Sequence, residues 1–496
     1  MSYKSKYQKV IFICLAVMLT IACNALTRIS PVSSVPPATT VVSSTFSPSS
    51  FKPGDPTATP LGSEIADPNY IKGVDAIYAG NYEEAVGFLS AAIETNPNLA
   101  PPYQFRGLAY WSLGDCISAL ADEEKALSIN PDYAAALARR GGIQFCLGND
   151  EQALIDSQKA LAMDPSLAFV HHNLGFYYYK QGDYEKALEE YEMSVAIDPG
   201  RSAGWAGKAQ ALTHLGRFDE CIFNATKALE INPEQWFAYS DKGFCELNLG
   251  DYPDAEISYK TYLDHEPNNS CAWVKLGVAQ EGLTKYNEAV NSYDRALEID
   301  PFSCEAYINR GSAFIHIGDY EKAIDDYNRA LELGDDNPII YSGRGTAYYY
   351  LGRYDEAIAD LELATQLPQN SSHSYCFLAL TYFEVGRYQD SLDTANKAVE
   401  IGSECGDQKI YEAEAQSYYE LGQYEQGIAY ITMIFDDRHQ IFALGYYYRG
   451  IMYASLGKNQ EAIKDLEFFL KMGKSIEDLY KEQVADAKER LTRLKP

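Results

Sequence analysis

The sequence is poor in basic residues and lacks the short motifs that usually mark an enzyme. Its 41 Lys and Arg residues stand against 70 Asp and Glu residues, which gives a formal net charge of −29. Such a charge repels phosphate backbones and favours basic partners, so we expect no nucleic-acid partner. The chain has no glycine-rich phosphate loop and no nucleophile elbow. We therefore predict a non-catalytic protein with no cofactor and no small-molecule substrate.

Metal-ligand spacings are also missing. No two cysteines stand in a C-x-x-C arrangement, and the seven histidines show no metal or catalytic spacing. The adjacent His171 and His172 are interpreted as helix-surface residues that face different sides. Acidic pairs such as Glu83–Glu84 and Glu123–Glu124 are interpreted as solvated faces. The sequence predicts no metal site.

Long apolar runs are scarce, and the clearest one lies at the N-terminus. Residues 10–22, VIFICLAVMLTIA, follow a short basic stretch. Thirteen helical residues span only about 20 Å, which is short of a hydrocarbon core of roughly 30 Å. Residues 1–22 are therefore predicted to be an export signal peptide.

The stretch LTIAC at residues 19–23 resembles the lipobox of bacterial lipoproteins. The resemblance implies that Cys23 carries a lipid, and that the protein is anchored to a cell membrane on its extracytoplasmic face. There are two alternatives: an uncleaved anchor, or a plain signal peptide followed by a Cys23 that carries no lipid. Residues 23–65 are rich in Ser, Thr and Pro, which predicts a disordered tether after the lipidated cysteine.

The rest of the chain is a repeat with a period of 34 residues over its first nine steps, followed by steps of 36 and 35. We take as a marker the residue at one fixed place in each of the twelve copies: Gly80, Gly114, Gly148, Gly182, Gly216, Gly250, Thr284, Gly318, Gly352, Gly386, Gly422 and Gly457. Each copy has two helical patterns that meet at the marker, and proline ends the second helix in the first seven copies. A fixed period of this size predicts a solenoid.

Small and aromatic residues recur at fixed places in the copies. Gly or Ala stands seven residues before the marker in all twelve, and Ala usually stands five after it. Two helices that cross closely need such sites. Tyrosines recur two and nine residues after the marker, so most of the 40 tyrosines are predicted to fill gaps between helices.

Residues 171–199, HHNLGFYYYKQGDYEKALEEYEMSVAIDP, resemble the tetratricopeptide repeat (TPR) family almost throughout. The resemblance extends over residues 66–474. It implies an all-α, right-handed superhelical solenoid of about twelve helix-turn-helix repeats, which residues 475–496 would close as a capping helix. The family pattern has a small residue twelve positions after the marker. Tyr262, Ile434 and Phe469 replace it, so repeats 6, 11 and 12 are expected to pack irregularly.

Arg and Asp co-occur within the repeats. Five repeats have Arg eight residues before the marker, and the same five have Asp eight residues after it. We predict a structural ion pair between the two helices of each such repeat. The predicted pairs are Arg106–Asp122, Arg140–Asp156, Arg310–Asp326, Arg344–Asp360 and Arg449–Asp465.

The remaining eight cysteines form pairs whose members are expected at similar positions along the axes of neighbouring helices. Cys116 with Cys146, and Cys221 with Cys245, are candidate disulfides, which an exported protein permits. Cys271 with Cys304, and Cys376 with Cys405, are weaker candidates. The alternative is that all eight are small buried thiols.

The family resemblance implies that the first helices line a concave groove that binds peptide or helical segments of protein partners. The implied lining consists of Trp111, Phe145, His172, Phe176, Tyr179, Phe244, Leu247, Ile315, Tyr349, Phe383 and Tyr419. A Lys/Asn/Arg clamp for a peptide carboxylate is not evident, because His172 and Phe176 occupy the matching places. We therefore expect a protein-interaction scaffold. The alternatives are a structural spacer whose groove is filled, or an accessory subunit that regulates an envelope enzyme.

Overall fold

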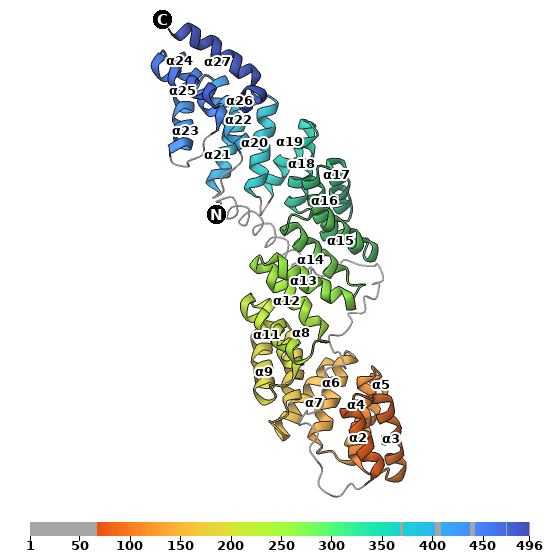
Figure 1. Cartoon of the computed structure of the whole chain (residues 1–496). Helices are drawn as coiled ribbons and strands as arrows, with labels where there is room; N and C mark the ends of the chain where they lie inside the picture. Colours follow the sequence, from red (N-terminus) through yellow and green to blue (C-terminus); the bar gives the residue numbers. More distant parts are fainter. Residues whose placement is uncertain (1–66, 368–370, 402–407, 437–441, 473, 496) are drawn as a thin grey trace. The chain divides into compact units, whose positions relative to one another are not determined.

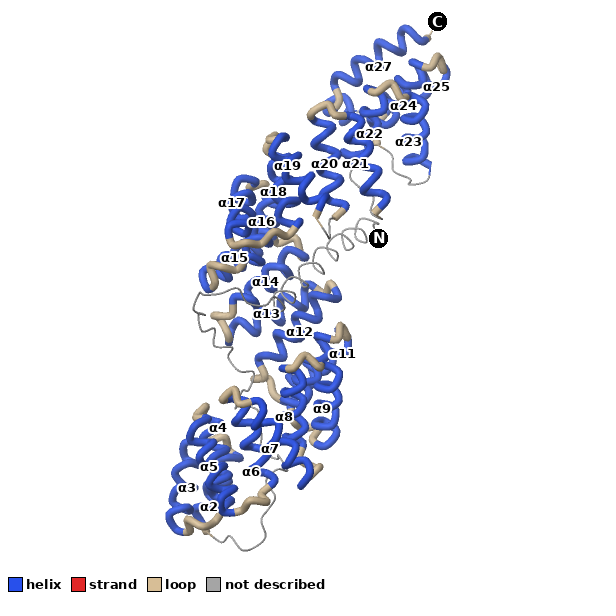
Figure 2. Tube along the Cα trace, turned by 180° about the vertical axis from the view of Figure 1, so that it is seen from behind, coloured by secondary structure: helices blue, strands red, loops and turns tan. Residues whose placement is uncertain are grey.

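The computed structural model describes residues 67–367, 371–401, 408–436, 442–472 and 474–495. These residues form 26 helices, and no strand occurs among them (Figures 1 and 2). The chain divides into two compact parts, which meet between Ile299 and Asp300 and are described separately below. The predicted signal peptide, Cys23 and the predicted tether lie outside the described residues.

The N-terminal part contains seven helix pairs, one for each of the first seven repeats. They are α2 (Pro68–Tyr78) with α3 (Tyr82–Thr95), α4 (Ala100–Ser112) with α5 (Cys116–Ile129), α6 (Ala134–Cys146) with α7 (Asp150–Met163), α8 (Ala168–Lys180) with α9 (Tyr184–Ile197), α10 (Ser202–His214) with α11 (Phe218–Ile231), α12 (Trp236–Leu249) with α13 (Tyr252–His265), and α14 (Ser270–Gly282) with α15 (Tyr286–Ile299).

The C-terminal part contains five further pairs and two terminal helices. They are α16 (Cys304–Ile317) with α17 (Tyr320–Glu332), α18 (Pro338–Tyr350) with α19 (Tyr354–Gln366), α20 (Ser372–Glu384) with α21 (Tyr388–Glu400), α22 (Gln408–Glu420) with α23 (Tyr424–Asp436), α24 (Ala443–Ser455) with α25 (Asn459–Lys471), then α26 (Lys474–Leu479) and α27 (Lys481–Leu494).

The marker residue forms the turn between the two helices of each repeat. All eleven marker glycines have positive φ, between 69° and 94°. In repeat 4 the N–H of Gly182 donates to the carbonyl of Tyr179 at 3.0 Å, and the N–H of Asp183 donates to the carbonyl of Tyr178 at 3.0 Å. These bonds satisfy the last carbonyls of the first helix, and the left-handed residue that they require favours glycine.

Close helix packing explains the small residue seven positions before the marker. A Cβ atom added at Gly277 would lie 2.4 Å from the ring of Tyr293, which stands nine residues after the marker in the same repeat. Gly243 and Tyr259 have the same relationship, at 2.9 Å. Tyr191, Tyr259, Tyr293 and Tyr327 are among the largest fully buried side chains. These tyrosines therefore fill the space between two helices, as the sequence predicts.

First and second helices form two layers within each part. First helices of successive repeats contact one another, as α8 does with α10 and α10 with α12, and as α18 does with α20 and α20 with α22. No two successive second helices among the described residues contact each other as extensively. The first helices therefore lie on the inner side of the curvature within each part, which is the arrangement that the family resemblance implies.

The structure departs from the sequence predictions in two places. Only repeat 11 packs loosely: α22 and α23 contact each other less than the helices of any other pair, whereas Tyr262 and Phe469 are buried in repeats of ordinary packing. The predicted capping helix is two helices, α26 and α27, because the chain leaves helical geometry at Tyr480. Helix α27 covers α25 and α24 with Val484, Ala487 and Leu491.

Candidate protein-binding face on the first helices

The eleven predicted lining residues all lie on first helices, and we call them together the first-helix face. Three of them, Trp111, Phe145 and Leu247, are buried. The other eight are half-buried: His172, Phe176, Tyr179, Phe244, Ile315, Tyr349, Phe383 and Tyr419. The face therefore has a filled section and sections that remain partly accessible.

The filled section lies over α4, α6 and α8. The rings of Trp111 on α4 and Phe169 on α8 meet edge to face at 5.5 Å between centroids. They reach each other across α6 because Gly142 stands between them, where a Cβ would lie 2.8 Å from Phe169 and 3.3 Å from Trp111. Phe145 likewise packs edge to face on Phe176 at 5.5 Å. Here the prediction of an open groove is wrong for Trp111 and Phe145, because these aromatic side chains complete the core.

A partly accessible section of the N-terminal part is built around Tyr179. Its hydroxyl lies 2.8 Å from Nε2 of His214 on α10. His214 in turn stacks on Tyr184 with ring centroids 4.3 Å apart. Burial, together with Asp241 and Tyr184, raises the pKa of Tyr179, so this hydroxyl stays protonated at neutral pH. The section combines aromatic surface with hydrogen-bonding groups, a composition suited to binding protein segments.

The C-terminal part carries a second partly accessible section. Tyr349 on α18 packs edge to face on Phe377 of α20, with ring centroids 5.5 Å apart. Phe383 packs against Tyr388 at 6.0 Å. Further along, Tyr419 of α22 lies 6.1 Å from Tyr448 of α24. The first and third contacts join successive first helices, the second joins α20 to its second helix α21, and Tyr349, Phe383 and Tyr419 are half-buried.

Two carboxyl groups on the first helices of the N-terminal part have raised pKa values. Burial raises the pKa of Asp241 on α12 to about 7. Burial also raises the pKa of Glu281 on α14 to about 8, and the Tyr293 hydroxyl partly opposes this effect. Neither carboxyl is among the eleven predicted lining residues, although both stand at places of the repeat where the other copies mostly have apolar or small residues.

All five predicted Arg–Asp pairs are present in the structure. The shortest N···O distances are 2.8 Å for Arg106–Asp122, 2.7 Å for Arg140–Asp156, 2.6 Å for Arg310–Asp326, 2.7 Å for Arg344–Asp360 and 2.7 Å for Arg449–Asp465. In each pair Nε and Nη2 of the guanidinium donate to the two carboxylate oxygens. The pairs hold the first helix of a repeat on its second helix and are structural.

The arginines also reach the preceding repeat, which the sequence analysis missed. Nη1 of Arg106 donates to Ser90 at 3.0 Å. Nη1 of Arg344 donates to Asn328 at 2.6 Å, and Nη1 of Arg449 donates to Thr432 at 3.1 Å. Each acceptor stands ten residues after the marker of the preceding repeat, so a polar residue there could have given the signal. One guanidinium therefore joins three helices.

Two groups predicted to be solvated are buried. Glu123 has no exposed surface and lies 3.5 Å from Nε of the buried Arg139 on the next first helix. His171 is also buried, with Nδ1 2.7 Å from Oε2 of Glu190. Burial and the nearby Arg201 lower the pKa of His172 to about 3, so this imidazole is neutral. The prediction was wrong for Glu123 and His171 because each is enclosed at a contact between a first and a second helix, where a charged or polar partner meets it.

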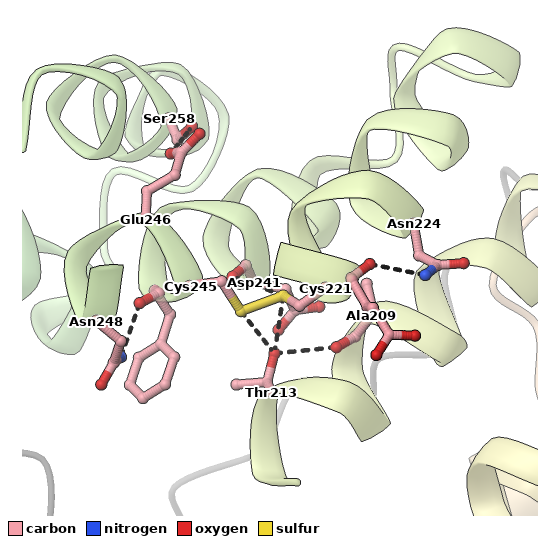
Figure 3. Close-up of a disulfide and its surroundings, with 11 residues drawn as sticks. Ala209, Thr213, Cys221, Asn224, Asp241, Cys245, Glu246, Asn248 and Ser258 are labelled. Atoms are coloured by element: carbon pink, nitrogen blue, oxygen red, sulfur yellow. Dashed lines mark hydrogen bonds between the residues drawn. A yellow bond between two sulfur atoms is a disulfide. The ribbon is translucent and has the colours of Figure 1, made fainter. Parts of the chain in front are cut away.

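The two better-supported cysteine pairs are disulfides in the structure. Cys116–Cys146 joins α5 to α6 and Cys221–Cys245 joins α11 to α12, with Cα–Cα distances of 6.8 and 6.5 Å. Figure 3 shows the second bridge beside Thr213, whose hydroxyl lies 3.3 Å from each sulfur. Cys304 is a free thiol, so the bridge considered with Cys271 is not formed. Cys376 is disulfide-bonded, whereas Cys405 lies outside the described residues.

The described part of the chain holds no cluster of three His, Cys, Asp or Glu residues suited to a metal ion. Within the same residues no helix is long and apolar enough to cross a membrane.

Known solved structures with similar folds include a chain of the Cut9–Hcn1 hetero-tetramer of APC/C, at 16% identity and a TM-score of 0.41, with 86% of this chain and 96% of that chain covered. Yeast Tom70 is 16% identical over 82% of this chain and 98% of its own, with a TM-score of 0.35. Pseudomonas aeruginosa pilF is 21% identical over 42% of this chain and 94% of its own, with a TM-score of 0.38. No curated protein sequence matches this chain.

Sequence models of one family match along most of the helical region. Tetratricopeptide repeat models match residues 100–133, 168–201, 203–235, 246–303, 292–325 and 343–404, and a TPR repeat model matches residues 311–351. Together these segments cover more than half of the chain. They coincide with the helix pairs and the left-handed turns described above, and the chain therefore belongs to the tetratricopeptide repeat family.

Proposed function

We propose that this protein is a non-catalytic scaffold that binds peptide or helical segments of other proteins along its first-helix face. The observation that carries the proposal is the set of half-buried aromatic side chains on successive first helices, chiefly Tyr179, Tyr349 and Phe383. Aromatic groups that are neither in the core nor fully solvated are typical of surfaces that become buried on binding. A repeated array supplies such a surface over a length that one compact domain does not offer.

A structural spacer is the second candidate. The burial of Trp111 and Phe145 favours it for the section over α4 and α6, where the predicted lining residues are part of the core. The half-buried residues further along the chain favour the scaffold. An accessory subunit that regulates an envelope enzyme would use the same face and would differ only in its partner.

The proposed location is the extracytoplasmic face of a cell membrane, with a lipid on Cys23 and residues 23–65 as the tether. It is supported by the short apolar run, by the LTIAC stretch and by the disulfides, which form in oxidising compartments. Mass spectrometry of the mature N-terminus tests it. A lipid on Cys23 is expected, and a mature chain that keeps residues 1–22 would contradict it.

The binding test is crosslinking and affinity capture from envelope extract. The test variant carries Tyr179→Ala, Tyr349→Ala and Phe383→Ala. A matched control carries Phe223→Ala, Phe302→Ala and Phe468→Ala, which remove three exposed aromatic side chains away from the first-helix face. Circular dichroism must show equal helicity for both variants.

We expect a protein that is captured by the parent chain and by the control, and is lost with the test variant. Capture that the test variant retains would contradict binding at the first-helix face, and the absence of any captured protein would favour the spacer.

A further inference from the structure

Several neighbouring repeats touch at the same place, where a second helix begins and the next first helix ends. There the residue two after one marker meets the residue two before the next marker, and we call this the helix-end contact. Tyr184 and His214 form it by stacking their rings, with centroids 4.3 Å apart. The other examples are the Asp150–Lys180 ion pair at 2.6 Å, the stacked rings of Tyr320 and Tyr350 at 4.9 Å, and the close approach of Tyr252 to Gly282.

Cys116 and Cys146 hold the helix-end contact between repeats 2 and 3. Cys116 is the first residue of α5, Cys146 is the last residue of α6, and a disulfide joins them. The four helix-end contacts named above are non-covalent, so the bridge stands where other repeats have a contact that can form and break. Repeats 2 and 3 are therefore held at this place by a bond that thiol chemistry can open.

The Cys116–Cys146 bridge lies at the surface. Both cysteines are half-buried, and the turns beside them, residues 113–115 and 147–149, are exposed. An attacking thiolate needs access to a sulfur atom, and this position offers it.

The Cys221–Cys245 bridge has a different place in the repeat. Its cysteines stand five residues after one marker and five before the next, and neither has exposed surface. The hydroxyl of Thr213 also lies 3.3 Å from each sulfur (Figure 3). This second bridge is therefore closed to a thiolate in the folded chain.

Repeats 2 and 3 also hold together by contacts other than the bridge. Glu123 of α5 lies 3.5 Å from Nε of Arg139 on α6, and both side chains are buried. Leu127 of α5 and Leu137 of α6 belong to the same apolar core. The Cys116–Cys146 bridge can therefore open while the chain stays folded.

We propose that the Cys116–Cys146 bridge is a site of thiol–disulfide exchange with a dithiol, and that its opening loosens the contact between repeats 2 and 3. A thiolate of the dithiol attacks one sulfur of the bridge, which breaks the S–S bond, forms a mixed disulfide and releases the other cysteine as a thiolate. The second thiol of the dithiol then displaces the bound cysteine. Two electrons and two protons pass to the bridge, so both cysteines end as thiols and the dithiol ends as a disulfide.

The test follows alkylation of the full chain, purified in detergent, under native conditions. Existing thiols are first blocked with N-ethylmaleimide. Dithiothreitol is the dithiol probe, and iodoacetamide labels the cysteines that it releases at successive times. Mass spectrometry of peptides compares Cys116 and Cys146 with Cys221 and Cys245, while circular dichroism follows helicity. The same reaction in denaturant is the control, because both bridges are accessible there.

We expect Cys116 and Cys146 to be labelled together, about tenfold or more faster than the buried pair, with helicity unchanged. In denaturant the two bridges should be reduced at similar rates. Equal rates in the folded chain, faster labelling of Cys221 and Cys245, or a loss of helicity as Cys116 and Cys146 become labelled would overturn the inference.

Amide hydrogen exchange tests the loosening itself. Exchange at the start of α5 and the end of α6 should become faster when the bridge between them is reduced. Cys116→Ser/Cys146→Ser should show the same faster exchange without a reductant, whereas the matched control Cys221→Ser/Cys245→Ser should leave α5 and α6 unchanged. Unchanged exchange in the first variant would show that the bridge does not restrain this contact and would overturn that part of the proposal.

Discussion

Arg140 and Asp156 form a two-pronged ion pair between α6 and α7. Nε of Arg140 donates to Oδ2 of Asp156 at 2.7 Å, and Nη2 donates to Oδ1 at 2.8 Å. Asp156 is almost completely buried, and Gln152 donates a further bond to it at 3.0 Å. This hydrogen bonding raises the pKa of Arg140, so the guanidinium remains charged. The same pairing in five repeats makes it a recurring element of the scaffold.

Removal of one partner should cost far more than removal of both. Asp156→Ala leaves a partly buried guanidinium without its carboxylate, and we expect a loss of about 3 kcal/mol in the free energy of unfolding. Arg140→Leu/Asp156→Leu should cost less, because no uncompensated charge remains. Chemical denaturation measures both. The paired account would be contradicted if the loss for the double change equalled the sum of the losses for the two single changes at Arg140 and Asp156.

The Cys221–Cys245 bridge should stabilise the N-terminal part. The bridge closes a loop of 24 residues between α11 and α12, so Cys221→Ala/Cys245→Ala is expected to cost about 2–4 kcal/mol. Denaturation with and without a reductant checks this, since the two proteins should converge when the bridge is reduced. Alkylation of Cys221 in the untreated, denatured protein would show that the bridge is absent.

Thr284 stands where the other eleven markers are glycine, and its φ is 60°. A β-branched residue is strained in this left-handed region. We expect Thr284→Gly to stabilise the protein by about 1 kcal/mol, measured as a higher denaturation midpoint. The reverse change, Gly250→Ala at φ 75°, should destabilise it. A loss of stability on Thr284→Gly would mean that contacts of the threonine side chain outweigh the backbone strain.

Asp241 should make stability depend on pH. Its pKa is about 7 in the folded protein, against about 3.9 in an unfolded chain. The folded state therefore binds more protons between these values, so stability should fall as pH rises through this window. Asp241→Asn removes that dependence, and its melting temperature should exceed that of the parent chain by a few degrees above about pH 7. If the melting temperatures of the two proteins change in parallel from acid to neutral pH, the pKa of Asp241 is not raised.

The repeat made most of the fold predictable. A fixed period, a turn glycine and paired small residues specify where each helix begins and which helix it crosses. The Arg–Asp pairs could be found because they co-occur at fixed distances from the marker, and the structure brings all five together. The disulfides were less predictable. The sequence gives the position of each cysteine along its helix, but not the direction in which its side chain points.

The candidate site was less predictable because it depends on contacts between repeats. Phe145 and Tyr179 hold the same place in neighbouring repeats, yet Phe145 is buried and Tyr179 is half-buried. Their neighbours on the next first helix differ, since the ring of Phe176 packs edge to face on Phe145 whereas Tyr179 meets the imidazole of His214. Glu123 was misassigned for a similar reason, because its partner Arg139 belongs to the following repeat.

Site-specific photocrosslinking tests the central claim most directly. A photoreactive amino acid replaces Tyr349 on α18, a first helix, or Ile257 on α13, a second helix whose side chain is well exposed. The account predicts a crosslinked partner protein in envelope extract from position 349 and none from position 257. Crosslinks from position 257 alone would place the binding surface on the second helices and would contradict the account.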